Sequence, residues 1–296
     1  HLTKVYDNGT VALEDVSFTV PDGQFLAVIG LSGSGKSTLL RCINRLIEPT
    51  EGQVIWNGID VTAAGQEDLR RIRRRIGMVF QHFNLVHRSK VITNVLSGRL
   101  GYTNPTLSLV NRFSEQDQLA ALDRLERVGL SDKAWSRADE LSGGQQQRVG
   151  IARALMQDPE MLLADEPVAS LDPVLAHSIM QHLEDIQSEG VTVLCSLHFL
   201  ALVHRYAERA IALFDGELVL ADIAPPRPEA PPDEAGPGPP PAPPRGPERG
   251  ARRRFLIVLA IVGAIVTYAL AFDYTEVDLE AAVSPARQES LTRIMR

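Results

Sequence analysis

The sequence predicts an α/β domain with a mainly parallel β-sheet, followed by a C-terminal extension of a different kind. Short apolar runs alternate with segments of helical spacing through residues 1–224, and parallel sheets are built from strands joined by helices. After residue 224 the composition changes abruptly to prolines and then to a long uncharged segment. We therefore expect one globular domain and a separate tail.

Local patterns predict the elements of the globular domain. The predicted elements are a half-exposed strand over 11–20, a buried strand over 25–29, a helix over 39–47, a strand over 53–56, short strands over 161–164 and 191–196, and a helical lobe over about 89–157. Alternating apolar residues indicate the first strand, and a continuous apolar run indicates the second. Pro49 ends the helix, and Asn57-Gly58 is typical of a hairpin turn.

The composition excludes several classes of protein. The 296 residues are 44% hydrophobic and 23% charged, which excludes a wholly disordered chain. The formal net charge is -7, whereas dedicated nucleic-acid binders usually carry a basic excess, so no nucleic-acid partner is expected. Cys42 and Cys195 lack disulfide or metal-ligand spacing, which favours a reducing, intracellular compartment. No N-terminal signal peptide is found, and because the chain starts at His1 we expect a few residues to precede it.

A phosphate-binding loop follows the strand predicted over 25–29. Residues 30–37 read GLSGSGKS and fit the pattern G-x-x-x-x-G-K-[ST]. Glycines let backbone N–H groups surround phosphate oxygens, and the next helix adds its positive end. Lys36 is placed to reach the β- and γ-phosphates, and Ser37 to ligate Mg²⁺. The predicted nucleotide-binding residues here are Gly30, Leu31, Ser32, Gly33, Ser34, Gly35, Lys36, Ser37 and Thr38.

A second motif places two carboxylates after the strand predicted over 161–164. Asp165 and Glu166 follow this apolar run directly. Adjacent strand residues point to opposite faces, so the two carboxylates are expected to do different work. We expect Asp165 to hold the water shell of the metal and Glu166 to polarise the attacking water.

A third motif, Leu-Ser-Gly-Gly-Gln at 141–145, stands at a predicted helix N-terminus. Backbone N–H groups, a serine hydroxyl and the helix dipole suit a second phosphate contact. One domain does not need two such sites for one nucleotide, whereas two copies facing each other do. We therefore expect Ser142, Gly143, Gly144 and Gln145 of each copy to complete the phosphate loop of the other.

In this order, the three motifs resemble the ATP-binding cassette (ABC) ATPases over nearly all of residues 1–222. The resemblance implies a P-loop NTPase fold with a RecA-like parallel-sheet core, an antiparallel β subdomain and a helical subdomain. It also implies ATP and Mg²⁺ as ligands and an ATP-sandwich homodimer that hydrolysis opens. Motion would pass to a membrane partner through the segment over about 82–103.

Single residues also match the family's pattern. Tyr6 matches the aromatic residue that stacks on adenine, and Gln81 matches the glutamine that touches Mg²⁺ and senses the transporter. Asp172 lies in the matching interface loop, and His198 matches the switch histidine at the γ-phosphate. The resemblance thus implies Glu166 and His198 as catalytic residues. The implied metal ligands are Ser37, Gln81 and Asp165.

Three shorter segments resemble the sequences of the phosphonate-import ATPases, the cassette subunits of bacterial phosphonate uptake systems. These segments are residues 94–101, 137–139 and 166–173. The expected partners are transmembrane permease subunits and a periplasmic or lipid-anchored phosphonate-binding protein. No residue is expected to touch the phosphonate itself, so an importer of another solute, such as amino acids, stays open as the alternative.

The tail departs from that family. Residues 225–247 hold twelve of the 19 prolines, and with the basic residues up to 254 they predict an extended linker. The eighteen uncharged residues 255–272 are long enough to span a bilayer, and the short tail over 273–296 is acidic. Arginines precede the span, which places the globular domain at the cytoplasmic face of the cell (inner) membrane. We expect the start of a fused permease that is truncated at Arg296, although a gene-model artefact would give the same sequence.

Other patterns favour less specific interpretations. The basic run over 70–75 has no interleaved aromatic residues, which favours a solvated helix face or a surface for an anion-rich partner. His82 and His87 lack a third metal ligand, so no metal is expected there. A DNA-repair or translation ATPase would carry a long coiled coil or a second cassette, and neither is found. A further alternative is a membrane-anchored nucleotide sensor that does not hydrolyse ATP. Such a protein would release no phosphate.

Overall fold

The computed structural model describes residues 1–102, 113–169 and 171–223. Its central sheet has six strands in the order β10-β9-β3-β8-β7-β6. All neighbouring pairs are parallel except β9 and β10. The strands are β3 (Phe25–Ile29), β6 (Ile76–Val79), β7 (Met161–Ala164), β8 (Thr192–Leu197), β9 (Arg209–Phe214) and β10 (Glu217–Ile223). The predicted α/β class with a mainly parallel sheet is therefore confirmed.

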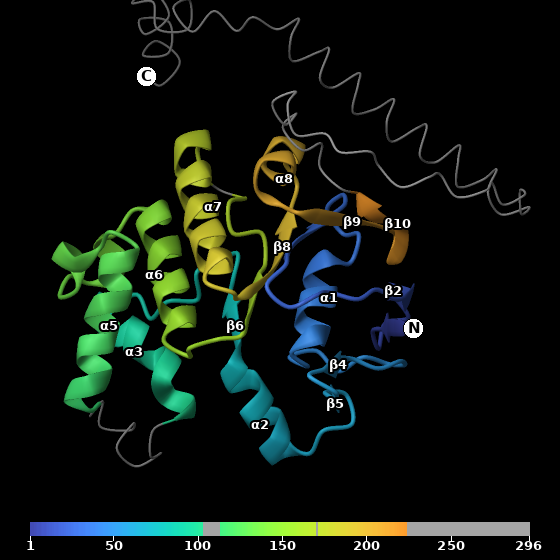
Figure 1. Cartoon of the computed structure of the whole chain (residues 1–296), viewed down its shortest axis with the longest axis horizontal. Helices are drawn as coiled ribbons and strands as arrows, with labels where there is room; N and C mark the ends of the chain where they lie inside the picture. Colours follow the sequence, from blue (N-terminus) through green and yellow to red (C-terminus); the bar gives the residue numbers. More distant parts are fainter. Residues whose placement is uncertain (103–112, 170, 224–296) are drawn as a thin grey trace, which may run out of the picture. The chain divides into compact units, whose positions relative to one another are not determined.

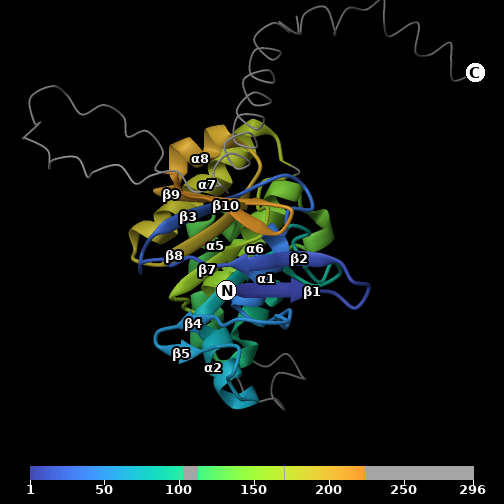
Figure 2. The same cartoon turned by 90° about the vertical axis from the view of Figure 1, so that its right-hand side faces the viewer.

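Two small antiparallel pairs flank the central sheet on the side of the N-terminus (Figures 1 and 2). They are β1 (Leu2–Val5) with β2 (Val11–Val16), and β4 (Ile55–Trp56) with β5 (Ile59–Asp60). The helices are α1 (Lys36–Ile43), α2 (Gln66–Arg75), α3 (Val91–Leu96), α5 (Glu115–Arg127), α6 (Gly143–Leu155), α7 (Pro173–Ser188) and α8 (Leu200–Tyr206). Short 3-10 helices are η1 (Ser97–Gly101), η2 (Ser131–Lys133) and η3 (Ala138–Glu140).

The central sheet separates two hydrophobic cores, because successive strand residues point to opposite faces. In β3, Phe25 and Ala27 join the core that contains α5, α6, α7 and α8 residues. Leu26 and Val28 join the other core, with α1, α2 and the small sheets. Burial on both faces explains why this strand is a continuous apolar run in the sequence.

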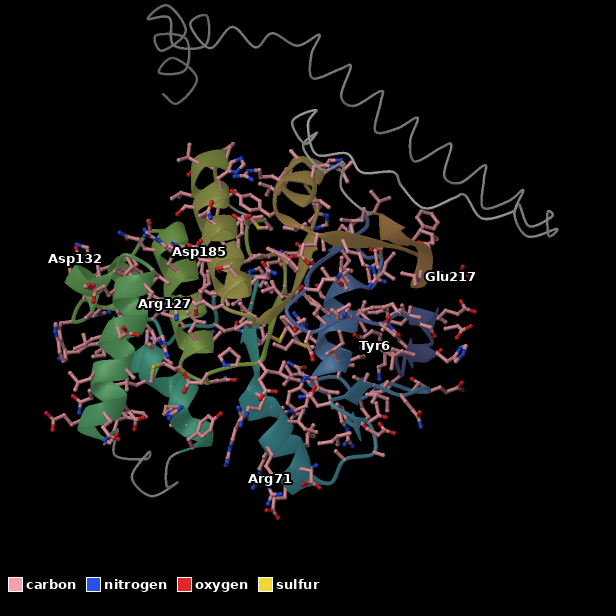
Figure 3. All side chains as sticks on the ribbon, viewed as in Figure 1. Tyr6, Arg71, Arg127, Asp132, Asp185 and Glu217 are labelled. Atoms are coloured by element: carbon pink, nitrogen blue, oxygen red, sulfur yellow. The ribbon has the colours of Figure 1, made fainter. Side chains whose placement is uncertain are left out.

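Helices α3, α5 and α6 pack together as a group on the side of the domain away from β1 and β2 (Figure 1). We call α3, η1, α5, η2, η3 and α6 the helical group. It occupies the region expected to be a helical lobe, and in its described part the one β-type pairing is the isolated bridge between Lys90 and Arg137. Figure 3 shows Arg127 and Asp132 on this group and Arg71 on α2.

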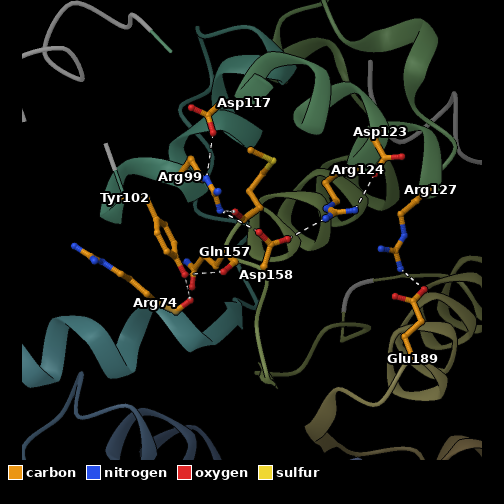
Figure 4. A network of polar contacts seen from close by, with 11 residues as sticks. Arg74, Arg99, Tyr102, Asp117, Asp123, Arg124, Arg127, Gln157, Asp158 and Glu189 are labelled. Atoms are coloured by element: carbon orange, nitrogen blue, oxygen red, sulfur yellow. Dashed lines mark hydrogen bonds and ion pairs between the residues drawn. The ribbon is translucent and has the colours of Figure 1, made fainter. Parts of the chain in front are cut away.

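A network of ion pairs joins the helical group to the loop that precedes β7 (Figure 4). Asp158 accepts from Arg99 at 3.1 Å and from Arg124 at 3.0 Å, and Arg99 also contacts Asp117 at 3.1 Å. Arg127 donates to Glu189 at the end of α7. Single exposed ion pairs contribute little to stability, whereas shared arginines in a network contribute more.

Several predicted boundaries were wrong for local reasons. The strand expected over 11–20 ends at Val16, the last residue that pairs with β1. Asp15 lies inside β2 with a left-handed φ of 48°, where the register with β1 is irregular. The helix expected over 39–47 starts earlier, at Lys36, because Gly35 caps it in a left-handed conformation. It ends at Ile43, before Arg45 turns left-handed with φ 55°.

Two other strand predictions need shorter or shifted bounds. Of the strand expected over 53–56, Ile55–Trp56 pairs as β4, and Asn57 with Gly58 forms its turn as predicted. The strand expected over 191–196 is β8, which extends to Leu197. The strands β1, β6, β9 and β10 had no predicted counterpart.

The basic run lies on α2 and is only partly a solvated face. Arg70 and Arg71 are exposed. Half-buried Arg73 instead donates to the carbonyl oxygens of Asn44 and Arg45, at 3.0 and 2.6 Å. The prediction of a solvated helix face therefore holds for Arg70, Arg71 and Arg75, and it fails for Arg73.

Within residues 1–102, 113–169 and 171–223, no helix combines the length and apolar character that crossing a bilayer requires. The predicted linker, the predicted span over 255–272 and the acidic tail lie outside the described residues.

Asn94 generates a prediction about stability. This buried residue of α3 accepts from the Val86 backbone N–H at 2.7 Å and donates to the Val86 carbonyl at 3.2 Å, which fixes the loop after Gln81. Asn94→Ala should lower the free energy of unfolding by about 1–3 kcal/mol, because it removes the partners of two backbone groups. Urea denaturation measures this loss. The control is Thr93→Ala, since among the described residues no side-chain hydrogen bond of this half-buried neighbour is seen. Equal losses in the two variants would contradict the assignment.

Candidate active site

The phosphate loop, residues 30–37, connects β3 to α1 at the C-terminal edge of the central sheet. Close backbone approach requires glycine at its two ends. A Cβ atom on Gly30 would lie 2.4 Å from the Leu213 carbonyl oxygen, and one on Gly35 would lie 2.4 Å from that of Ala12. The sequence folds this way locally because no other residue type fits either position.

Lys36 is the buried cation of this loop. Its side chain is 3% exposed, and its ammonium group donates to the carbonyl oxygens of Gly30 and Leu31, each at 2.9 Å. It also lies 3.7 Å from the Glu166 carboxylate. Burial lowers the pKa of Lys36, although the negative charge of Glu166 opposes this shift. The loop therefore holds a desolvated positive charge where a phosphate could replace weak carbonyl partners.

Glu166 follows β7 and is surrounded by three polar side chains. Its carboxylate lies 2.6 Å from His198 Nε2, 3.1 Å from Gln81 Nε2 and 3.7 Å from Lys36 Nζ. Its backbone is left-handed, with φ 47°, which is uncommon for a residue with a side chain. The structure thus brings together residues predicted from four separate segments, at the ends of β3, β6, β7 and β8.

Asp165 is fully buried, and its carboxylate contacts a different set of side chains from that of Glu166. Ser37 Oγ donates to its Oδ1 at 2.7 Å, Arg41 contacts its Oδ2 at 3.1 Å, and Ser196 Oγ lies 3.4 Å from Oδ1. Buried carboxylates require such partners. Asp165 therefore lies directly beside the phosphate loop, which the sequence predicted.

Tyr6 lies beside the same loop. Its hydroxyl is 3.3 Å from the Thr38 hydroxyl, its side chain is 37% exposed, and Lys4 lies 5.3 Å from its ring centroid. Figure 3 shows Tyr6 on the side of the domain that carries β1 and α1. An accessible aromatic ring at the edge of a phosphate site can stack on a base.

Other predicted residues lie elsewhere. Ser142 begins α6 with a capping box, in which its hydroxyl accepts from the Gln145 N–H and Gln145 accepts from the Ser142 N–H. Asp172 caps α7 by accepting from the N–H groups of Val174 and Leu175. In the described part of the chain, no hydrogen bond or ion pair joins Ser142, Gly143, Gly144 or Gln145 to the group around Glu166.

Two side chains in contact with Asp165 were missed from the sequence, Arg41 and Ser196. A signal for Arg41 exists, since it follows Ser37 by four residues and so lies on the same face of α1. The signal for Ser196 is a hydroxyl inside the apolar strand β8, every residue of which is buried.

The donor set fits a small hard cation. Ser37, Gln81 and Asp165 supply hydroxyl, amide and carboxylate oxygens, the ligand types that Mg²⁺ prefers. The Ser37 and Asp165 oxygens already lie 2.7 Å apart. Bound Mg²⁺ would neutralise charge on the phosphates.

The sequence of this chain is similar to a known protein family and to individual proteins of known name. The ABC transporter family model matches residues 13–169. The chain is 52% identical over 221 residues to a phosphonates import ATP-binding protein PhnC from Bdellovibrio bacteriovorus, covering 74% of this chain and 85% of that protein. It is 50% identical over 220 residues to the PhnC protein of Lactobacillus johnsonii, covering 74% of this chain and 87% of the relative.

Solved structures share the fold. A dimeric post-hydrolysis state of the ATP-binding cassette MJ0796, bound to ADP and Pi, has a TM-score of 0.66 at 37% identity, covering 73% of this chain and 94% of that one. A nucleotide-free ATP-binding cassette from an ABC transporter has a TM-score of 0.66 at 32% identity, covering 74% and 87%.

The buried ammonium of Lys36 predicts a pH dependence of stability. Its native pKa lies below that of an unfolded lysine, about 10.4, so between these two values the unfolded chain binds more protons. Stability contributed by this group therefore rises with pH across that window. The unfolding free energy of the wild type minus that of Lys36→Met should increase with pH, as measured by urea denaturation without nucleotide. A constant difference would show that Lys36 is not desolvated.

Proposed function

The chain belongs to the ABC transporter family of ATP-binding proteins, and from this premise we propose that it is the ATPase subunit of a bacterial importer of phosphonates. It is an ATPase of the ABC type. The observation that carries the substrate class is identity of about 50% to phosphonate import ATP-binding proteins over about 220 residues.

Hydrolysis would begin with an exchange of partners by Lys36. Its ammonium contacts two loop carbonyls and lies 3.7 Å from Glu166. Phosphate oxygens carry more charge than carbonyl oxygens, so ATP would draw Lys36 to the β- and γ-phosphates. This exchange frees one side of Glu166, which could then orient a water at the γ-phosphate.

The surroundings of Glu166 suit a general base. His198 and Gln81 lie at 2.6 and 3.1 Å from its oxygens and would fix the orientation of the carboxylate. His198 would also contact the γ-phosphate, and Tyr6 would stack on the adenine. Positioning and charge neutralisation supply most of the acceleration in phosphoryl transfer.

We propose that a second copy completes each site. Ser142 and its neighbours have no polar contact with the group around Glu166 in the described residues, yet they present a helix N-terminus suited to phosphate. Contacts of Ser142, Gly143, Gly144 and Gln145 of one copy with ATP on the other would close the dimer. Asp172, at the start of α7, would lie near this interface.

The remaining partners would be those of an importer. ABC importer ATPases in general associate with permease subunits at the cytoplasmic face of the membrane. We propose phosphonate permease subunits and a periplasmic or lipid-anchored phosphonate-binding protein as specific partners. The segment over 255–272 stays a predicted membrane anchor, and as a tether it would raise the effective concentration of the cassette at the permease.

The alternative is an importer of another small solute, such as amino acids. The two functions can be distinguished by which solute stimulates ATP hydrolysis. In vesicles that hold the permease and the cognate binding protein, phosphonates should stimulate ATP hydrolysis, whereas amino acids should not. Stimulation by amino acids alone would favour the alternative.

Glu166→Gln should lower ATP hydrolysis by about 10²–10⁴-fold, because an amide cannot accept the proton of the water. ATP binding and the ATP-dependent dimer should remain, as measured by phosphate release and by size-exclusion chromatography. Glu160→Gln is the matched control, since this carboxylate pairs with Arg75 before β7 begins. Survival of hydrolysis in Glu166→Gln would refute the assignment of the base.

A mixing experiment tests the shared site. Lys36→Met should inactivate the phosphate loop of its own copy, and Ser142→Arg should inactivate the surface that serves the other copy. A mixed dimer then holds one site with both defects and one site with none. Activity should therefore appear on mixing two inactive variants, with phosphate release as the readout. No recovery, with mixed dimers demonstrated, would contradict the shared site.

A further inference from the structure

Ser196 is a hydroxyl in a place where the fold otherwise uses apolar side chains. It lies in β8, between β3 and β7 in the central sheet, and all six residues of this strand are buried. Ser196 itself has no exposed surface. Burying a hydroxyl without hydrogen-bond partners destabilises the fold. The partners of Ser196 therefore indicate its role.

Both partners of Ser196 belong to the acidic pair. The backbone N–H of Glu166 donates to Ser196 Oγ at 2.8 Å, and Ser196 Oγ lies 3.4 Å from Asp165 Oδ1. The same Asp165 oxygen accepts from Ser37 Oγ at 2.7 Å. A continuous chain of hydrogen bonds therefore runs from the Glu166 backbone through Ser196 and Asp165 to the phosphate loop.

The contact with the Glu166 backbone differs from the contacts with its carboxylate. Gln81, Lys36 and His198 contact the carboxylate, and each of them is also expected to contact phosphate or metal when ATP binds. Ser196 is buried behind the acidic pair and does not compete for the nucleotide. Its bond can therefore persist through the cycle and hold Glu166 in its left-handed conformation, φ 47°.

We propose that Ser196 is a positioning residue that fixes the Glu166 carboxylate relative to Asp165 and the phosphate loop. This inference rests on the proposed ATPase mechanism, in which Glu166 orients the water. The rate of the reaction depends on the placement of the reacting groups, and small displacements of these groups lower it strongly. The role requires an oxygen that accepts from a backbone N–H, and it does not require contact with ATP.

Three substitutions separate hydrogen bonding from packing. Ser196→Ala removes the hydroxyl, Ser196→Thr retains it, and Ser196→Cys fills the space with a thiol that is only a weak acceptor. Ser196→Ala and Ser196→Cys should lower kcat at least about tenfold. The KM for ATP should change by less than about twofold, because binding is unaffected. Ser196→Thr should recover most of the lost kcat.

Thr192 offers a matched control at the other end of the same strand. It is also buried, and its Oγ1 accepts from the Gly23 backbone N–H at 2.9 Å. Thr192→Val removes an equivalent hydrogen bond far from the acidic pair and should leave kcat within about twofold of the wild type. Equal losses of kcat in Thr192→Val and Ser196→Ala would indicate a general structural effect and overturn the inference.

A second readout does not depend on turnover. In the Glu166→Gln background, Ser196→Ala should leave ATP binding and the ATP-dependent dimer intact, as expected for a residue that positions only the base. Loss of that dimer, full kcat in Ser196→Ala, or equal recovery by Ser196→Cys and Ser196→Thr would each overturn the proposal. A wild-type chain without hydrolysis would instead overturn the proposed mechanism, and this inference with it.

Discussion

The hydrogen bond between Ser37 and Asp165 is the contact on which the rest of the site depends. It joins the phosphate loop after β3 to the end of β7 at 2.7 Å, across 128 positions of sequence. In the sheet these strands are separated by β8 alone, so their C-terminal ends must meet at one edge. Ligand sites of open parallel sheets form at this edge. The strand between them then contributes Ser196 and directs the chain to His198.

The same packing buries charged groups at the site. Lys36 is almost completely buried, and Asp165 is completely buried. Two charge contacts offset part of the cost of removing these groups from water. They are the ion pair between Arg41 and Asp165 and the proximity of Lys36 to Glu166. Active sites commonly trade stability for function, because buried charges that serve a substrate lower the stability of the fold.

The helical group shows how this site connects to the rest of the domain. Gln81 contacts Glu166, and the loop that follows it is fixed to α3 by Asn94. The ion pairs of Asp158 attach α5 and η1 to the loop before β7 (Figure 4). Two polar attachments therefore connect the helical group to the strands that carry the acidic pair. These polar attachments add to the apolar core that α5 and α6 share with the central sheet.

The sequence by itself determined the phosphate loop, the acidic pair, the α/β class and the strands β3 and β7, because each depends on contiguous residues whose spacing has direct physical meaning. It did not determine the end of β2, which depends on pairing with β1, or the boundaries of α1, which lie next to the left-handed residues Gly35 and Arg45. Nor did it show that Arg41 and Ser196 contact Asp165. Only the tertiary structure decided this, because the partners of a buried polar group are set by which strands lie side by side, and strand order is not encoded in local spacing.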